Sequence, residues 1–146
     1  MTRIAVISDT HDRMPPGLPD RLVDANEIWH LGDVCRPETL DRIEALGIAV
    51  RVISGNCDYL NLWPGVMRRT VHGVRFHLEH IAPGRPPPET DAILSGHTHV
   101  PSRRAENGVT WLNPGCISRP NRGAPASFAW LEIREDGKWT WALELV

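Results

Sequence analysis

The sequence predicts an α/β protein, and two observations lead to this prediction. In the first third of the chain, short apolar runs alternate with segments of helical pattern, and a polar cluster follows each apolar run. In the remainder, apolar runs are paired across turns that contain glycine, which is the pattern of β-hairpins. A parallel sheet built from the first third would place its polar clusters at one edge, where α/β proteins bind their ligands.

The first third of the chain has the pattern strand, helix, strand, helix, strand. Its apolar runs are short and flanked by polar residues, which indicates buried strands. The second helix is the clearer one, because Pro37 stands in its first turn and Gly47 follows its last apolar residue. The expected strands are Arg3–Ile7, Ile28–Leu31 and Ala49–Ser54, and the expected helices are Pro19–Ala25 and Pro37–Leu46.

The rest of the chain predicts a second, mostly antiparallel sheet packed on the first. Turn pairs such as Asn107-Gly108 separate its apolar runs. Four residues that alternate along the last run, Trp139, Trp141, Leu143 and Leu145, predict a strand face in the core. The expected strands are Arg68–Val71, Val74–His80, Ala92–Ser95, Ser102–Ala105, Val109–Leu112, Ser127–Ile133 and Lys138–Leu145.

Length and composition indicate one ordinary domain, covering residues 1–146. The 146 residues are 41% hydrophobic and 23% charged, with a formal net charge of −2. This charge gives no electrostatic footprint for nucleic acid or for an anionic membrane. No apolar run approaches membrane-spanning length and nothing resembles a signal peptide, so we expect a cytoplasmic protein.

The three cysteines are odd in number and lack Cys-x-x-Cys spacing. This pattern argues against a disulfide framework or a thiolate zinc site, and it favours a reducing compartment. We expect Cys35 and Cys116 to be small buried hydrophobic residues, and Cys57 to pack near a polar cluster.

The polar clusters contain the side chains that bind metals. His97 and His99 stand two apart just after a strand, and residues two apart in extended chain share a face. Acidic and amide groups alone would also suit capping or turn roles, which remains the alternative for each of them. The candidate ligands are Asp9, His11, Asp33, Asn56, His80, His97 and His99, whereas His30, His72 and His77 are interpreted as structural.

Seven nitrogen and oxygen ligands exceed the needs of one tetrahedral zinc ion and suit two divalent cations that share a carboxylate. Such paired sites promote in-line displacement at phosphorus, because they activate water and bind the phosphoryl oxygens. Oxygen and imidazole donors without thiolate favour Mn, Fe, Ni, Co or Zn over Mg or Ca.

Five segments in this order resemble the calcineurin-like metallophosphoesterases, and most closely their small single-domain prokaryotic phosphodiesterase branch. These segments are Asp9-x-His11, Gly32-Asp33, Gly55-Asn56-x-Asp58, His80 and Gly96-His97-x-His99. The resemblance covers nearly the whole chain. It implies a four-layer α/β sandwich, with two mixed β-sheets flanked by helices.

The resemblance also implies a dinuclear site, with manganese the expected metal. Asp9, His11 and His99 would hold one cation, Asn56, His80 and His97 the other, and Asp33 would bridge them. A metal-bridging hydroxide would attack a small phosphoester. The implied catalytic residues are Asp33, Asn56, Cys57 and Asp58, and the residues that could touch substrate phosphate are Arg13, Tyr59, Arg119 and Arg122. Relatives often form homo-oligomers.

The sequence departs from the family pattern in two places. Cys57 stands where many relatives carry a histidine that assists the leaving group, and Ala82 stands where they carry another histidine. We therefore expect hydrolysis of phosphodiesters with good leaving groups, such as aryl esters. The alternative is a catalytically weak scaffold on the same fold, like the eukaryotic retromer relative; the presence of all seven ligands favours the enzyme.

Overall fold

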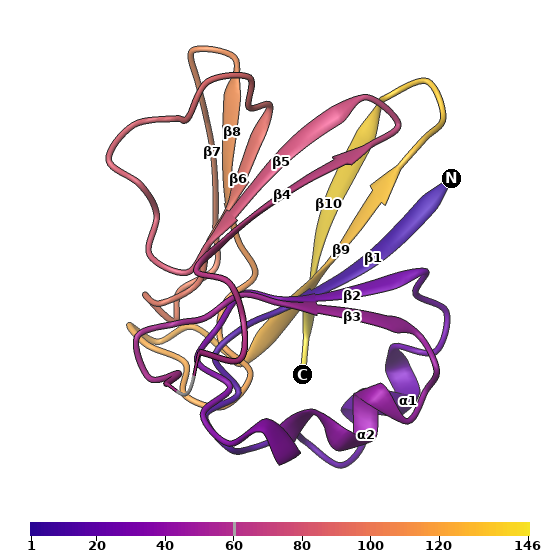
Figure 1. Ribbon diagram of the computed structural model, residues 1–146, viewed down its shortest axis with the longest axis vertical. Coiled ribbons are helices and arrows are strands. Elements are labelled where there is room, and N and C mark those ends of the chain that lie inside the picture. The colour runs from indigo at the N-terminus through magenta and orange to yellow at the C-terminus, as the bar shows by residue number, and fades with distance from the viewer. Residues whose placement is uncertain (60) are drawn as a thin grey trace.

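The computed structural model describes residues 1–59 and 61–146, and their strands form two five-stranded sheets that face each other (Figure 1). The first sheet contains β1 (Thr2–Ile7), β2 (Glu27–His30), β3 (Ala49–Val52), β9 (Ser127–Ile133) and β10 (Trp139–Leu145), in the order β10-β9-β1-β2-β3. The second contains β4 (Val66–Val71), β5 (Val74–Glu79), β6 (Ala92–Leu94), β7 (Ser102–Glu106) and β8 (Val109–Asn113), in the order β4-β5-β6-β8-β7.

The helices are shorter than the sequence pattern indicates. The first, α1, is Leu18–Arg21, and the second segment is a 3₁₀ turn, Pro37–Leu40, that leads into α2 (Asp41–Glu44). Pro37 suits this start, because proline lacks the N–H that the first turn leaves unpaired, and 3₁₀ turns are frequent at helix ends. No helix among the described residues is long and apolar enough to cross a membrane.

The expected helical layer on the outer face of the second sheet is wrong for the described residues. Figure 1 shows helices only beside the first sheet. On the second sheet, the Arg68 guanidinium donates hydrogen bonds to the Glu89 carbonyl and the Thr90 hydroxyl, at the end of a proline-rich segment. A segment with Pro83 and Pro86–Pro88 lacks the N–H groups that a helix needs, which explains why a loop lies there instead.

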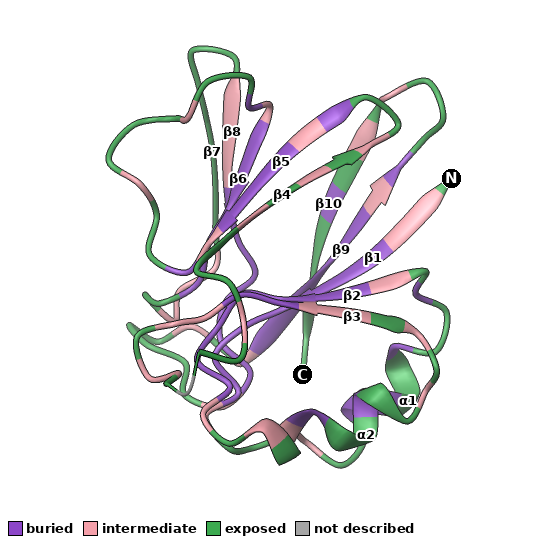
Figure 2. Cartoon of the chain, in the orientation of Figure 1, coloured by how far each residue is buried: buried purple, intermediate pink, exposed green. Residues whose placement is uncertain are grey.

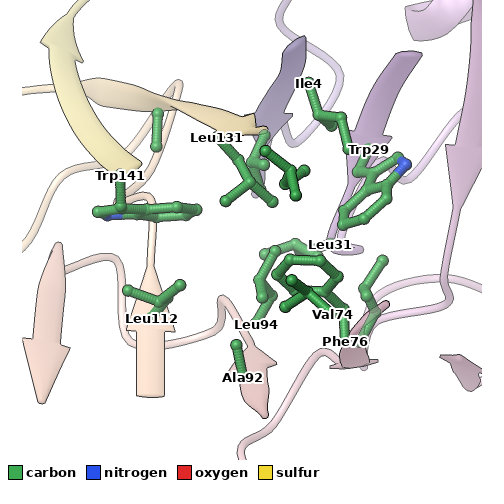
Figure 3. Close-up of a cluster of buried hydrophobic side chains, with 14 of the residues drawn as sticks. Ile4, Trp29, Leu31, Val74, Phe76, Ala92, Leu94, Leu112, Leu131 and Trp141 are labelled. Atoms are coloured by element: carbon green, nitrogen blue, oxygen red, sulfur yellow. The ribbon is translucent and has the colours of Figure 1, made fainter. Parts of the chain in front are cut away.

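Two hydrophobic cores explain why the strands of the first sheet are apolar on both faces. Ile4 and Val6 pack between the sheets, whereas Ala5 and Ile7 pack in the core that contains the helix residues. Figure 2 shows the resulting burial of the central strands. The core between the sheets is drawn in Figure 3 and includes Trp29, Leu31, Phe76, Leu94, Leu112 and Leu131.

The C-terminal hairpin belongs to the first sheet, whereas the sequence pattern had assigned it to the second. β9 lies between β1 and β10 and is antiparallel to both. Phe128 and Trp130 enter the helix-side core, while Ala129 and Leu131 enter the core between the sheets. A strand that is buried on both faces needs a neighbour on each side, and the first sheet supplies β1 for this role.

Two further expectations about the strands need correction. The second sheet is mixed, as the family resemblance implied, and not mostly antiparallel: β5, β6 and β8 are parallel and only its two outer pairs are antiparallel. The last strand does not place all its alternating residues in the core. Trp141 is buried, but Leu143 is 46% exposed and Leu145 is 61% exposed, since they lie on an edge strand (Figure 2).

Candidate metal centre

The seven candidate ligands come from loops that follow strands of both sheets. The parallel strands of each sheet end at the same side, so the loops after β1, β2, β3, β5 and β6 gather at one end of the molecule (Figure 1). These loops contribute Asp9 and His11, Asp33, Asn56, His80, and His97 with His99 respectively.

Two carboxylates and three imidazoles form the inner part of the cluster. Asp9 Oδ1 lies 3.2 Å from His99 Nε2 and 3.5 Å from His11 Nε2. Asp33 Oδ2 lies 3.3 Å from His80 Nε2 and 3.6 Å from His11 Nε2. The five side chains therefore point their donor atoms at a common space, which is the arrangement of a His/Asp metal-binding site.

Backbone carbonyls fix the orientation of two of these rings. His80 Nδ1 donates to the Leu31 carbonyl at 2.7 Å, and His99 Nδ1 donates to the Arg119 carbonyl at 2.5 Å. A proton on Nδ1 leaves the lone pair of Nε2 free, and in both rings Nε2 faces the carboxylates. Metal-binding histidines are commonly held in this way.

Two buried atoms of the cluster lack a hydrogen-bond partner among the described residues. They are Asp9 Oδ1 and His80 Nε2, which lie 3.8 Å apart. Leaving such groups unpaired away from water is costly, so the cluster calls for a bound cation. The residues present thus fit the divalent metals that the donor set favours.

Electrostatics inside the cluster keep Asp33 charged. Burial raises its pKa, but the nearby imidazole of His80 and the backbone N–H of Cys57 outweigh burial and lower the pKa of Asp33 to about 2. The effect is mutual: burial lowers the pKa of His80, and the carboxylates of Asp33 and Asp9 raise it above its ordinary value. A cation would replace the proton that these carboxylates attract.

The outer part of the cluster contains Asn56 and His97. Asn56 Oδ1 lies 3.0 Å from His97 Nδ1, and the rings of His97 and His80 are 5.3 Å apart. Both residues are exposed, whereas Asp9, Asp33 and His80 are buried. The cluster is therefore open to solvent on this side.

Two glycines allow the strand ends to approach each other. A Cβ on Gly96 would lie 2.1 Å from Ser8 Oγ and 2.7 Å from Asp9 Oδ2, and one on Gly55 would lie 2.2 Å from Asp33 Oδ1. Each glycine precedes a candidate ligand and faces another ligand from a different loop. The Gly-Asn and Gly-His pairs in the sequence thus reflect close packing around the two carboxylates.

Five of the seven candidate ligands have a left-handed backbone, which non-glycine residues seldom adopt. The φ angles are 59° at Asp9, 43° at His11, 58° at Asp33, 69° at His97 and 62° at His99. Conformations of this kind cost on the order of 1–3 kcal/mol each and concentrate at functional sites.

Asp58 connects two loops of the site. Its carboxylate accepts hydrogen bonds from the backbone N–H groups of Asp33, Cys35 and Gly55, each at 2.8 Å. Cys57 N–H in turn donates to Asp33 Oδ1 at 2.8 Å. These bonds hold the loops after β2 and β3 against each other.

The residues expected to touch substrate differ in their placement. Arg122 and His97 line one pocket of about 500 Å³, while Arg119 reaches the cluster through its carbonyl. Arg13 and Tyr59 are exposed. A second pocket, of about 250 Å³, also adjoins the cluster, and its lining includes Asn56, His80 and Ile81.

Sequence reasoning missed three kinds of contributor to the site: a neighbouring hydroxyl, two backbone carbonyls and a thiol. Ser8 Oγ donates to Asp9 Oδ2 at 2.6 Å, and the Leu31 and Arg119 carbonyls orient two rings; no sequence pattern marks these roles. The third is Cys35, which is half-buried and lies 3.7 Å from His11 Nδ1, whereas Cys116 is buried as expected.

The other histidines have structural contacts. His30 is fully buried between Thr10 Oγ1 and the Gly32 N–H, and burial lowers its pKa to about 3. His77 contacts Glu79 at 2.8 Å, and His72 contacts Thr2 at 2.8 Å.

Comparison with known proteins identifies similar chains. The profile of the calcineurin-like phosphoesterase superfamily domain matches residues 2–136. A probable metallophosphoesterase of Methanocaldococcus jannaschii is 33% identical over 134 residues, which covers 80% of this chain and 69% of that protein.

Solved structures with the same fold include a phosphoesterase and a sorting protein. The Escherichia coli phosphoesterase YfcE superposes with a TM-score of 0.77 at 23% identity, covering 97% of this chain and 98% of that one. Entamoeba histolytica Vps29, in a complex with zinc, superposes with a TM-score of 0.77 at 21% identity and covers 98% of both chains. These likenesses establish the shared fold.

Proposed function

Because the chain belongs to the calcineurin-like phosphoesterase superfamily, we propose that it is a phosphodiesterase that works with two divalent cations. The observation that supports this most directly is the pair of unpartnered buried atoms, Asp9 Oδ1 and His80 Nε2, in a cluster of carboxylates and imidazoles. Cations would satisfy both atoms at once.

The residues divide into two sets around Asp33. Asp9, His11 and His99 would hold one cation, because Asp9 Oδ1 faces Nε2 of both rings. Asn56, His80 and His97 would hold the other, and Asp33 would serve both through Oδ2. Bound cations of this kind supply activation of water and charge neutralisation at phosphoryl oxygens. We propose Mn as the metal, with Ni, Fe, Co or Zn as alternatives, since oxygen and imidazole donors suit all of them.

Substrate would approach from the open side of the cluster. Asn56 and His97 are exposed there, and pockets adjoin each of them. A phosphodiester carries two organic groups, so the two pockets could each receive one of them. Arg122 would favour an anionic group in the pocket beside His97.

Neither Asp58 nor Cys57 is well suited to protonate the leaving group. The Asp58 carboxylate already accepts three backbone N–H groups, so we assign it a positioning role. Burial and the Asp33 carboxylate raise the pKa of Cys57, but a thiol at this position has no positive charge to offer a departing oxygen. Substrates whose leaving groups need no proton, such as aryl phosphodiesters, should therefore react fastest.

The test is hydrolysis of bis-p-nitrophenyl phosphate with Mn²⁺ or Ni²⁺, comparing the wild type with Asp33→Asn. Substitutions around metal sites commonly cost 10–100-fold in activity, so loss of the central carboxylate should lower kcat/KM by about 100-fold or more. Asp24→Asn is the matched control, since that carboxylate is 81% exposed and far from the cluster in the fold. Equal rates for the wild type and Asp33→Asn would refute the proposal and favour a scaffold.

A further inference from the structure

A second group of metal-binding atoms lies beside the candidate dinuclear centre. It consists of a ring nitrogen of His11, Cys35 Sγ and Cys57 Sγ, and these three ligand atoms lie within 4.8 Å of one another. The three residues come from the loops after β1, β2 and β3, and each is half-buried. No two of them are close in sequence, which explains why cysteine spacing gave no sign of this group.

His11 belongs to both groups through opposite sides of its ring. Nε2 faces Asp9 and Asp33, at 3.5 and 3.6 Å, whereas Nδ1 lies 3.7 Å from Cys35 Sγ. Cys35 Sγ therefore lies on the Nδ1 side of the ring, whereas Cys57 Sγ lies beside the Asp33 carboxylate and 3.7 Å from Asn56 Nδ2.

The distances are those of a nearly formed tetrahedral site. With Zn–S about 2.3 Å and Zn–N about 2.0–2.1 Å, tetrahedral angles require N···S separations of about 3.6 Å and S···S separations of about 3.8 Å. The His11–Cys35 pair already meets this requirement at 3.7 Å. Cys57 Sγ lies within 4.8 Å of both other atoms, so a side-chain movement of about 1 Å would complete the set.

The backbone around both cysteines is fixed, and its surroundings are negative. Cys35 N–H donates to Asp58 Oδ1 and Cys57 N–H donates to Asp33 Oδ1, each at 2.8 Å. The same two carboxylates lie beside the thiols and favour a positive charge there. A cation would enter a site whose backbone is already held in place, so that only the Cys57 side chain would have to move.

We propose that His11 Nδ1, Cys35 Sγ and Cys57 Sγ form a separate site for one thiophilic cation, of the class of Zn²⁺ or Cd²⁺. Binding releases one proton from each thiol, and a water or another ligand would occupy the fourth position.

Occupancy of this site would oppose occupancy of the dinuclear centre, and this consequence rests on the proposed function. A neutral imidazole carries one ring proton, so when Nε2 binds a cation of the centre, Nδ1 keeps that proton. A cation at Nδ1 would require the proton to move or to leave. Excess Zn²⁺ should therefore lower hydrolysis supported by Mn²⁺, through His11.

The site is tested by titrating the metal-free protein with Cd²⁺ and recording the ultraviolet charge-transfer absorption of cadmium–thiolate bonds. The wild type should develop this absorption during the titration, and Cys35→Ser and Cys57→Ser should each lose most of it. Cys116→Ser is the matched control and should retain it, because Cys116 lies in the core. Absence of the absorption in the wild type, or its persistence in Cys35→Ser, would overturn the site. Imidazole and carboxylate ligands give no such band, so this result is independent of phosphoesterase activity.

The coupling is tested by the Zn²⁺ concentration that halves the Mn²⁺-supported rate. Loss of residues that support metal ligands commonly weakens metal binding 10–100-fold. Loss of two ligands should weaken it at least as much, so the double variant Cys35→Ser/Cys57→Ser should need at least about tenfold more Zn²⁺, relative to its own uninhibited rate. Equal Zn²⁺ sensitivity of both proteins would overturn the coupling. An inactive wild type would count against the proposed function, while the cadmium absorption would still decide the site.

Discussion

Replacing Asp9 with asparagine should separate two effects on stability: the destabilisation that the carboxylate causes in the metal-free protein and the stabilisation that a bound cation supplies. Asp9 is fully buried, and its Oδ1 has no hydrogen-bond partner in the described part of the chain. Asparagine has the same shape and removes the charge. We therefore expect metal-free Asp9→Asn to unfold at a higher temperature than the metal-free wild type, because a buried, unpaired charge is destabilising.

Addition of metal should reverse this order. A cation present at 100 times its dissociation constant stabilises the folded state by about 2.7 kcal/mol. For a chain of 146 residues this corresponds to a rise of roughly 5–11 °C in Tm. If the substitution weakens binding about 100-fold, the stabilisation falls to about 0.4 kcal/mol, which is below roughly 2 °C.

The assay is thermal unfolding followed by circular dichroism, in a chelator and then in Mn²⁺, for the wild type, Asp9→Asn and Asp24→Asn. The exposed Asp24 provides the control, which should shift with metal as the wild type does. The reasoning fails if Mn²⁺ leaves the wild-type Tm unchanged, or if Asp9→Asn gains as much from metal as the wild type.

Two further predictions concern the packing and titration of the site. Gly96→Ala should destabilise the protein by about 1–3 kcal/mol and weaken metal binding, because the new Cβ would collide with Ser8 and displace the Asp9 carboxylate. Gly84→Ala, where a Cβ meets nothing within 4 Å, is its control, and equal denaturant midpoints would contradict the packing argument. Folding lowers the pKa of His30 from 6.5 to about 3. Between these two pH values, the unfolded chain binds a proton at His30 and the folded protein does not. Stability should therefore fall as pH drops below 6.5, by up to about 1.4 kcal/mol per pH unit, and chelator-treated His30→Gln should show a shallower slope. An identical slope in denaturant titrations of both proteins would exclude His30 as the cause.

The sequence contained enough to predict the order of elements and the place of the site. Asp9, Asp33 and Asn56 follow apolar runs too short for helices, and parallel strands must end at a common edge. Hairpins such as the one at Asn107-Gly108 were predictable for the same local reason, since the turn residues adopt the left-handed backbone that such turns need.

The parts that could not be predicted depend on contacts between distant segments. β9 pairs with the sheet that can bury Phe128 and Trp130 on one face and Leu131 on the other. The local sequence of β9 does not indicate which sheet this is. The roles of backbone groups could not be predicted either, because the Leu31 carbonyl would orient His80 with any side chain at position 31. The proximity of Cys35 to Cys57 arises only after Asp58 joins their loops.

The same contacts bear on whether the site needs a bound cation. A protein that used only its outer surface would have no need for a buried, unpaired Asp9 Oδ1, and a neutral side chain at that position would relieve it. Left-handed backbone at His97 and His99 adds strain that a loop of different sequence would avoid. Both costs are explained if a cation binds the donor atoms, since the cation satisfies Asp9 and needs both imidazoles turned toward it. A metal-free wild type that proved as stable as its Asp9→Asn variant would remove the cost on which this argument for a bound cation rests.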